Sequence, residues 1–137
     1  MLSQYHTLLQ KPVRNVPLVL VVDDNEDNIL FACGAIELLN LQHIVAKSGR
    51  VAIDLSKDKL PDVILLDVVM PEMDGITVMQ TLKRHPLTNH IPIIAVTGLA
   101  LPAQQEMILQ GGCDDYLCKP YMIEELEKKL AVFLDLN

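Results

Sequence analysis

The amino-acid sequence predicts an α/β fold, a doubly wound sheet of five parallel strands with helices on both faces. Short apolar segments alternate five times with longer amphipathic segments, which is the pattern of consecutive βα units. The apolar segments are rich in Val, Ile and Leu, as is typical of strands that helices cover on both sides. Because crossovers between parallel strands are right-handed, this repeat folds into a doubly wound sheet.

Each predicted strand is followed by the helix that returns the chain to the start of the sheet. In chain order the strands lie near 18–22, 43–46, 62–66, 92–96 and 114–118, and the helices near 25–40, 49–58, 75–85, 102–110 and 121–134. Pro102 suits the first turn of the fourth helix, and Gly111 suits its end. The last helix is amphipathic, because its apolar residues fall on one stripe: Met122, Ile123, Leu126, Leu130 and Phe133.

The overall composition limits the location and the kind of partner. The 137 residues, half of them hydrophobic, suffice for one ordered domain, which we place at residues 17–137. Residues 1–16 show no clear apolar period, and we expect an N-terminal extension that is ordered only in part. No apolar run is long enough for membrane insertion and no secretory signal is present, so a cytoplasmic location is expected. The net charge of −7 disfavours direct binding of nucleic acid and favours a protein partner.

Acidic residues stand directly after two of the predicted strands. Asp23 and Asp24 follow the first strand, and Asp67 follows the third. Two adjacent acids are also typical of a helix start, where they cap the helix or lie in its first turn. In a doubly wound sheet, however, the first and third strands are neighbours, and ligands bind at the carboxyl ends of the strands. We therefore expect the three carboxylates to converge on one crevice.

A cation would stabilise such a crevice. Three carboxylates that lie close together repel one another, and their pKa values rise unless a positive charge is present. Mg²⁺ favours carboxylate and water oxygens, so it suits this cluster better than Zn²⁺ does. No His or Cys follows the strands in an arrangement typical of a zinc site.

Two further polar residues end two of the three remaining strands. Thr97 closes the fourth predicted strand, and Lys119 closes the fifth. A metal ion, an ammonium group and a hydroxyl group that meet at one point can bind three oxygens of a phosphoryl group. The joint placement of these residues therefore indicates a phosphoryl site.

Four motifs carry a resemblance to a known family. The segments VLVVDDNEDN, VILLDVVMPEMDG, AVTGLA and GGCDDYLCKPY occur in this order, and the chain resembles the receiver domain of two-component response regulators over roughly residues 17–135. The resemblance implies a flavodoxin-like fold with the strand order 2-1-3-4-5. It also implies a stand-alone signalling protein of a phosphorelay that binds Mg²⁺ and is not an enzyme.

The resemblance further implies a role for each residue of the crevice. Asp67 accepts a phosphoryl group from a sensor histidine kinase or a histidine phosphotransfer protein. Asp24 binds Mg²⁺ directly, Asp23 does so mainly through water, and Val69 contributes its backbone carbonyl. Lys119 forms an ion pair with Asp67 and later with the phosphoryl group.

A switch also follows from the resemblance. Thr97 would move toward the phosphoryl oxygens, and Tyr116 would then turn inward. This movement would change the surface made by the segments near 102–110, 114–118 and 121–134. We expect that surface to bind a separate downstream effector protein, or a second copy of the chain in a homodimer.

Two local features complete the expectation. The resemblance implies a docking face for the kinase on the first predicted helix, formed by Asn28, Ile29 and Ala32. Gly75, in the turn after the third strand, is expected to permit a positive φ.

Two alternatives stay open. A Mg²⁺-dependent aspartyl-phosphate phosphatase of the haloacid dehalogenase type needs an acid two residues after its nucleophile, where this chain has Val69. A receiver-like module that only binds partners usually lacks an acid or the lysine, and none is missing here. Because Val69 and Leu99 are both apolar, neither can orient an attacking water, and slow loss of the phosphoryl group is expected. Whether the output is effector binding or phosphoryl relay is not decided by the sequence.

Overall fold

The structure, a computed structural model, is described here for residues 12–70, 74–98 and 102–136, and it contains a five-stranded parallel sheet. The strands are β1 (Leu18–Val22), β2 (Gln42–Ala46), β3 (Val63–Asp67), β4 (Ile93–Thr97) and β5 (Asp115–Cys118). The helices are α2 (Glu26–Leu38), α3 (Gly49–Lys59), α4 (Gly75–Arg84), α5 (Pro102–Gln110) and α6 (Ile123–Phe133). The strand order is β2-β1-β3-β4-β5, which confirms the predicted fold class and topology.

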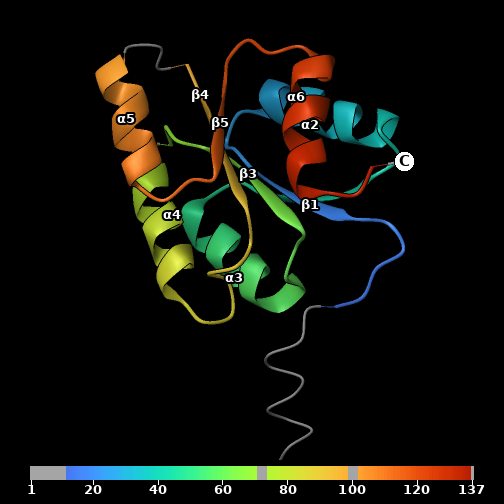
Figure 1. Cartoon of the computed structure of the whole chain (residues 1–137), viewed down its shortest axis with the longest axis horizontal. Helices are drawn as coiled ribbons and strands as arrows, with labels where there is room; N and C mark the ends of the chain where they lie inside the picture. The colour runs from blue at the N-terminus through green and yellow to red at the C-terminus, as the bar shows by residue number, and fades with distance from the viewer. Residues whose placement is uncertain (1–11, 71–73, 99–101, 137) are drawn as a thin grey trace, which may run out of the picture.

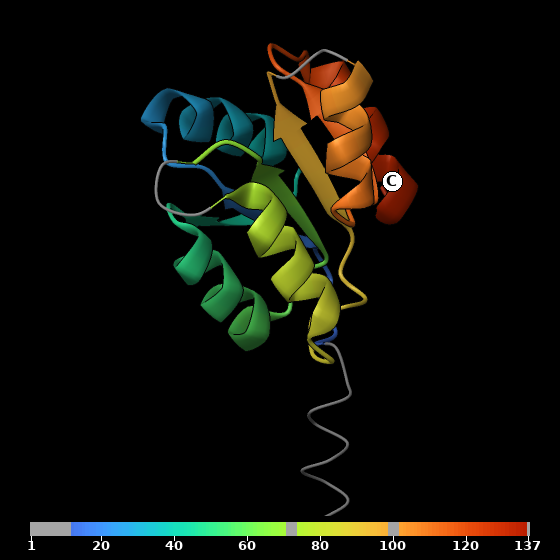
Figure 2. The ribbon, with the colours of Figure 1, turned by 90° about the vertical axis from the view of Figure 1, so that its left-hand side faces the viewer.

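The sheet lies between two helical layers (Figures 1 and 2). Strand side chains alternate between the faces, so Leu20 and Ile64 belong to the core under α3, α4 and α5. Val19 and Leu65 belong to the core under α2 and α6. Because both faces are covered, β1, β3 and β4 are buried along their whole length, as their continuous apolar sequences predict. No helix within the described residues is both long enough and apolar enough to cross a membrane.

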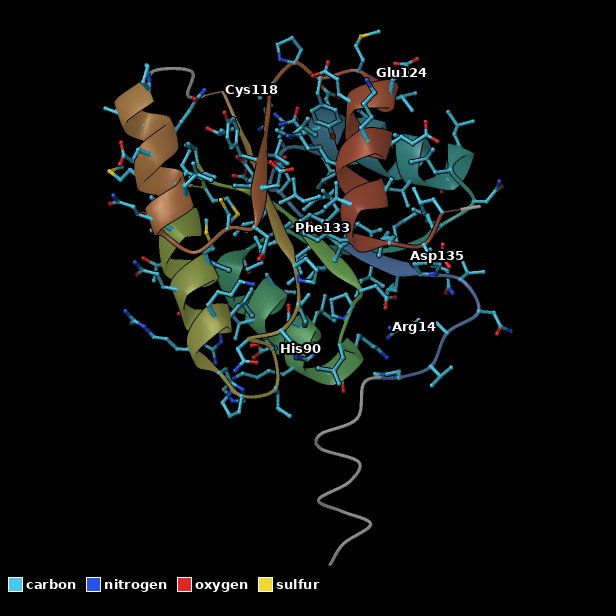
Figure 3. The ribbon with its side chains drawn as sticks, viewed as in Figure 1. Arg14, His90, Cys118, Glu124, Phe133 and Asp135 are labelled. Atoms are coloured by element: carbon cyan, nitrogen blue, oxygen red, sulfur yellow. The ribbon has the colours of Figure 1, made fainter. Side chains whose placement is uncertain are left out.

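The segment before β1 is attached to the end of α3 through Arg14. The Arg14 guanidinium donates to the backbone carbonyl of Leu60 at 3.1 Å and to that of Lys59, and its Nη1 lies 3.5 Å from Asp62 Oδ2. These contacts lie at the amino ends of the strands, and Figure 3 shows Arg14 at the opposite end of the molecule from Cys118. Residues 1–11 of the predicted extension lie outside the described residues.

The first residue of α4 packs directly on the backbone that leaves β3. The Gly75 N–H donates to the Val68 carbonyl at 3.0 Å. A Cβ atom added at Gly75 would lie 2.6 Å from Val68 Cα and 2.7 Å from the Asp67 carbonyl oxygen. The expected positive φ at Gly75 is wrong, because Gly112 is the glycine with a positive φ among the described residues. Glycine stands at this position because the backbone after Asp67 leaves no room for a side chain.

Two glycine substitutions should therefore change stability in opposite directions. We expect Gly75→Ala to lower the free energy of unfolding by about 1–3 kcal/mol, because the new methyl group must displace backbone atoms. Gly34→Ala is the matched control: Gly34 lies inside α2, and an added Cβ meets no atom of another element within 4 Å. This control should raise stability by about 0.5–1 kcal/mol through helix propensity. Urea denaturation followed by circular dichroism measures both, and equal effects of the two substitutions would contradict the packing explanation.

Candidate functional site

Three carboxylates meet at the carboxyl ends of β1 and β3. Val22 and Leu66 are partners in the parallel ladder, so Asp23 and Asp67 leave adjacent strands at the same level. One carboxylate oxygen from each of Asp23, Asp24 and Asp67 lies within 4.8 Å of the other two. Asp23 and Asp67 are only 6% and 5% exposed, whereas Asp24 is exposed. The structure thus brings together the three acids that the sequence placed in one crevice.

Backbone N–H groups orient the two buried carboxylates. Asp23 Oδ1 accepts a hydrogen bond from the Asn25 N–H at 3.0 Å, and Asp67 Oδ1 accepts one from the Val69 N–H at 3.2 Å. Asn25 is the N-cap of α2, where its side-chain oxygen accepts from the Asn28 N–H. Asn25 therefore caps α2, and a capping role does not explain the presence of Asp23 and Asp24.

Lys119 supplies positive charge to the crevice. Its Nζ lies 3.4 Å from Asp67 Oδ1 and 3.8 Å from Asp23 Oδ2. The residue follows β5 directly, and its backbone N–H donates to the Thr97 carbonyl at 2.8 Å. The peptide bond between Lys119 and Pro120 is cis. Among the described residues of this crevice, one ammonium group therefore faces three carboxyl groups, and acidic groups are in excess.

The electrostatics of the crevice favour a bound cation. Burial raises the pKa of the Asp67 carboxyl above its usual value, and the charge of Asp23 raises it further. The Val69 N–H and Lys119 lower the pKa of Asp67, but they do not reverse the shift. A hard divalent cation relieves this repulsion, and three carboxylate oxygens within reach of one point match the oxygen ligands that Mg²⁺ prefers.

Thr97 and Tyr116 occupy different places relative to the crevice. Thr97 ends β4, next to the ladder partner of Asp67, and is fully buried. Tyr116 lies on β5 between two helices, where its hydroxyl donates to Gln105 Oε1 on α5 at 3.3 Å. From α6, Lys129 Nζ lies 5.6 Å from the centre of the Tyr116 ring. The sequence offered no signal for Gln105 or Lys129, because a single Gln or Lys on an amphipathic helix is ordinary.

Of the two apolar residues that cannot orient an attacking water, Val69 lies within the described residues. The Val69 side chain is 62% exposed and stands next to the crevice. Leu99 lies outside the described residues.

A pocket of about 450 Å³ adjoins the carboxylates between α2 and the segment after β5. The rings of Phe31 and Tyr121 pack edge to face at its wall, with 5.3 Å between their centres. Burial and the nearby charge of Asp23 raise the pKa of the Tyr121 hydroxyl to about 12, so this group stays neutral. The sequence did not indicate this pocket, because its two rings come from segments that are 90 residues apart.

The predicted docking face on α2 needs correction. Ile29 and Ala32 are 7% and 3% exposed and belong to the buried side of the helix. Asn28 lines the pocket, and the exposed apolar residues of this part of the helix are Leu30 and Phe31. The prediction differs from the structure because the packing of α2 on the sheet decides which of its side chains face the core. The sequence motif alone does not show this orientation.

Comparison with known proteins places this geometry in one family. The sequence matches the response regulator receiver domain over residues 19–131. The polar-differentiation response regulator DivK of Brucella ovis is 37% identical over 116 residues, which cover 85% of this chain and 94% of DivK.

Solved structures agree with the match. The chemotaxis protein CheY4 of Vibrio cholerae aligns with a TM-score of 0.81 and 26% identity, over 87% of this chain and 99% of that one. The receiver domain of the sensor histidine kinase PA1611 from Pseudomonas aeruginosa PAO1 aligns with a TM-score of 0.81 and 29% identity, over 86% and 97% of the two chains. That domain holds a magnesium ion coordinated in its active site cleft.

The raised pKa of Asp67 predicts a pH-dependent cost of folding when no divalent cation is present. An unfolded Asp titrates near pH ~3.9, so above that value the folded chain holds the Asp67 proton more tightly and stability falls as pH rises. With a chelator present, Asp67→Asn should therefore be more stable than the parent chain at pH 7. The difference should narrow as the pH is lowered toward ~4.

Urea denaturation at several pH values measures this difference. Asp54→Asn, which changes an exposed carboxylate on α3, is the matched control and should show little difference at any pH. An Asp67→Asn protein that is less stable than the parent chain at pH 7 would contradict the prediction.

Proposed function

The chain belongs to the family of response regulator receiver domains of two-component systems, and we propose that it accepts a phosphoryl group on Asp67 from a histidine-phosphorylated partner. The observation that carries this proposal is the cluster of Asp23, Asp24 and Asp67 with Lys119 Nζ at 3.4 Å from Asp67 Oδ1. The donor is a sensor histidine kinase or a histidine phosphotransfer protein. We propose a signalling role rather than that of an enzyme.

The residues around Asp67 fit a Mg²⁺ site. Asp24 would bind the ion directly, Asp23 mainly through water, and Asp67 and the backbone carbonyl of Val69 would complete the protein ligands. The ion, when bound, neutralises the carboxylates and the phosphoryl oxygens that approach them. The exposed position of Asp24 and the burial of Asp23 support this division of roles.

The transfer is a displacement at phosphorus. A carboxylate oxygen of Asp67 forms a bond to the phosphorus atom while the bond from phosphorus to the donor imidazole nitrogen breaks, and the imidazole keeps the electron pair. Lys119 binds one phosphoryl oxygen by charge, and the Thr97 hydroxyl donates to another. Val69 carries no acid that could serve turnover of a substrate, which supports a stored phosphoryl group rather than phosphatase activity.

The stored phosphoryl group would act on the surface formed by α5, β5 and α6. Tyr116 lies in this surface and contacts both helices through Gln105 and Lys129. If Thr97 moves toward the phosphoryl group, Tyr116 turns inward and both contacts change. This surface is our candidate for binding the effector protein, and for a homodimer of the chain.

The remaining expectations stand as proposals. We place the donor protein on the exposed α2 residues Leu30 and Phe31, because Phe31 lines the pocket beside the crevice and Leu30 is the exposed residue next to it in the helix. The division into an extension of residues 1–16 and a receiver domain of residues 17–137 is supported by the family match, which begins at residue 19. A cytoplasmic location is proposed by analogy with the family.

Phosphorylation is tested by intact mass after incubation with phosphoramidate and Mg²⁺. One phosphoryl group should be added to the parent chain and none to Asp67→Asn, because the nucleophile is gone. Replacing Mg²⁺ by a chelator should reduce the rate by at least about tenfold, since the carboxylates then repel the donor. Unmodified parent protein that retains its circular dichroism spectrum would overturn the proposal.

The switch is tested by hydrogen exchange of α5 and β5 with and without the phosphodonor. Phosphorylation should change exchange in these elements in the parent chain, and Tyr116→Ala should abolish most of that change while Asp67 is still modified. Met107→Ala, which truncates an exposed side chain on α5, is the matched control and should behave like the parent chain. An undiminished response in Tyr116→Ala would exclude Tyr116 as the switch.

A further inference from the structure

The pocket beside the carboxylates has an apolar body that phosphoryl transfer does not use. Its floor is formed by Val21, Leu65 and Val96, which project from three adjacent strands toward the helical layer of α2 and α6. Ala32 on α2 also lines the pocket, and its small side chain occupies less of this space than a larger residue would. The volume of about 450 Å³ lies within the range of ~300–1,000 Å³ that is usual for small-molecule sites.

Two aromatic rings form the wall of the pocket. Phe31 from α2 and Tyr121 from the segment after β5 pack edge to face with an interplanar angle of 66°. Phe31 is 46% exposed, so one part of its ring faces the solvent while another lines the pocket. A flat or elongated apolar group could contact both rings at little cost in side-chain ordering.

The polar end of the pocket carries an excess of negative charge. Asp23 and Asp67 line it, each more than nine-tenths buried, and Asp24 lies within 4.8 Å of both. Lys119 is the one cationic residue among the lining residues, and it already lies against Asp67 and Asp23. A ligand with a positive head compensates this charge, whereas an anionic head would lie against the carboxylates.

We propose that this pocket binds a small organic cation with an apolar body, of the arylalkylamine class, and that the ligand competes with divalent cations for Asp23 and Asp67. The ammonium group lies against the two carboxylates, and the apolar body lies over Val96 and Ala32 beside the two rings. Such a ligand would keep the crevice from binding Mg²⁺. Binding to the unmodified chain does not require that Asp67 be able to accept a phosphoryl group.

The charge requirement is tested with three probes of similar shape in a buffer that contains a chelator and no phosphodonor. Phenethylamine, 2-phenylethanol and phenylacetate are titrated into the full chain, and binding is followed by NMR chemical shifts. Phenethylamine should bind saturably with a dissociation constant of ~1 mM, as expected for so small a ligand. The neutral alcohol should bind at least about tenfold more weakly, and phenylacetate more weakly still. Equal affinity for the amine and the alcohol, or no saturable shift with the amine, overturns the proposal.

Competition and substitution locate the ligand. Excess Mg²⁺ should weaken the apparent affinity for phenethylamine at least about fivefold, and an unchanged affinity overturns the shared use of the carboxylates. Phe31→Ala, at a partly exposed position where folding should be preserved, should weaken binding roughly fivefold. Leu38→Ala is the matched control on the same helix, with an exposed side chain outside the pocket, and should bind like the parent chain. Phe31→Ala with the affinity of the parent chain overturns the location.

The amine titration and the phosphoramidate reaction together separate the proposed ligand site from the proposed phosphoryl acceptance. Amine binding by a chain that phosphoramidate does not modify would refute the proposed phosphoryl acceptance alone. A chain that is modified on Asp67 but shows no charge-dependent amine binding would refute the ligand site alone.

Discussion

The chemistry of the site depends on two carboxylates that are held almost out of contact with water at the ends of adjacent strands. Asp23 and Asp67 are placed there by the parallel ladder between β1 and β3, which ends at the same level on both strands. Burial of two like charges is costly, and the single nearby ammonium group of Lys119 offsets only part of that cost. The surrounding packing, such as Gly75 against the backbone after Asp67, keeps the acids in place despite this cost.

Because Lys119 offsets only part of the negative charge of Asp23 and Asp67, the site favours ligands that bring positive charge. A divalent cation would restore the balance of charge, and in the proposed reaction Lys119 and Thr97 would bind the phosphoryl group in the same surroundings. The two proposals share this origin, since an organic cation would meet the same two carboxylates from the apolar side of the crevice. The two proposals differ in the space that each ligand needs. Only the organic cation would occupy the pocket lined by Phe31 and Tyr121.

Strand β5 lies between the crevice and the surface on which the proposed switch would act. Lys119 directly follows β5, and its Nζ lies 3.4 Å from Asp67 Oδ1. Tyr116, three residues earlier, contacts Gln105 on α5 and Lys129 on α6. Lys129 also forms an ion pair with Asp115 at 3.0 Å, so β5 and α6 are joined by charge as well as by packing. In the proposed switch, these contacts on both sides of β5 would carry a change at the carboxylates to α5 and α6.

The sequence by itself determined the order of strands and helices and the convergence of Asp23, Asp24 and Asp67, because periodicity and residues at strand ends are local features of the chain. Every predicted element lies within two residues of its observed bounds. Only the tertiary structure decided that Ile29 and Ala32 face the core, that Gly75 is required by close packing, and that Phe31 meets Tyr121. These outcomes depend on how each helix is rotated and seated on the sheet, and contacts between distant segments determine that rotation.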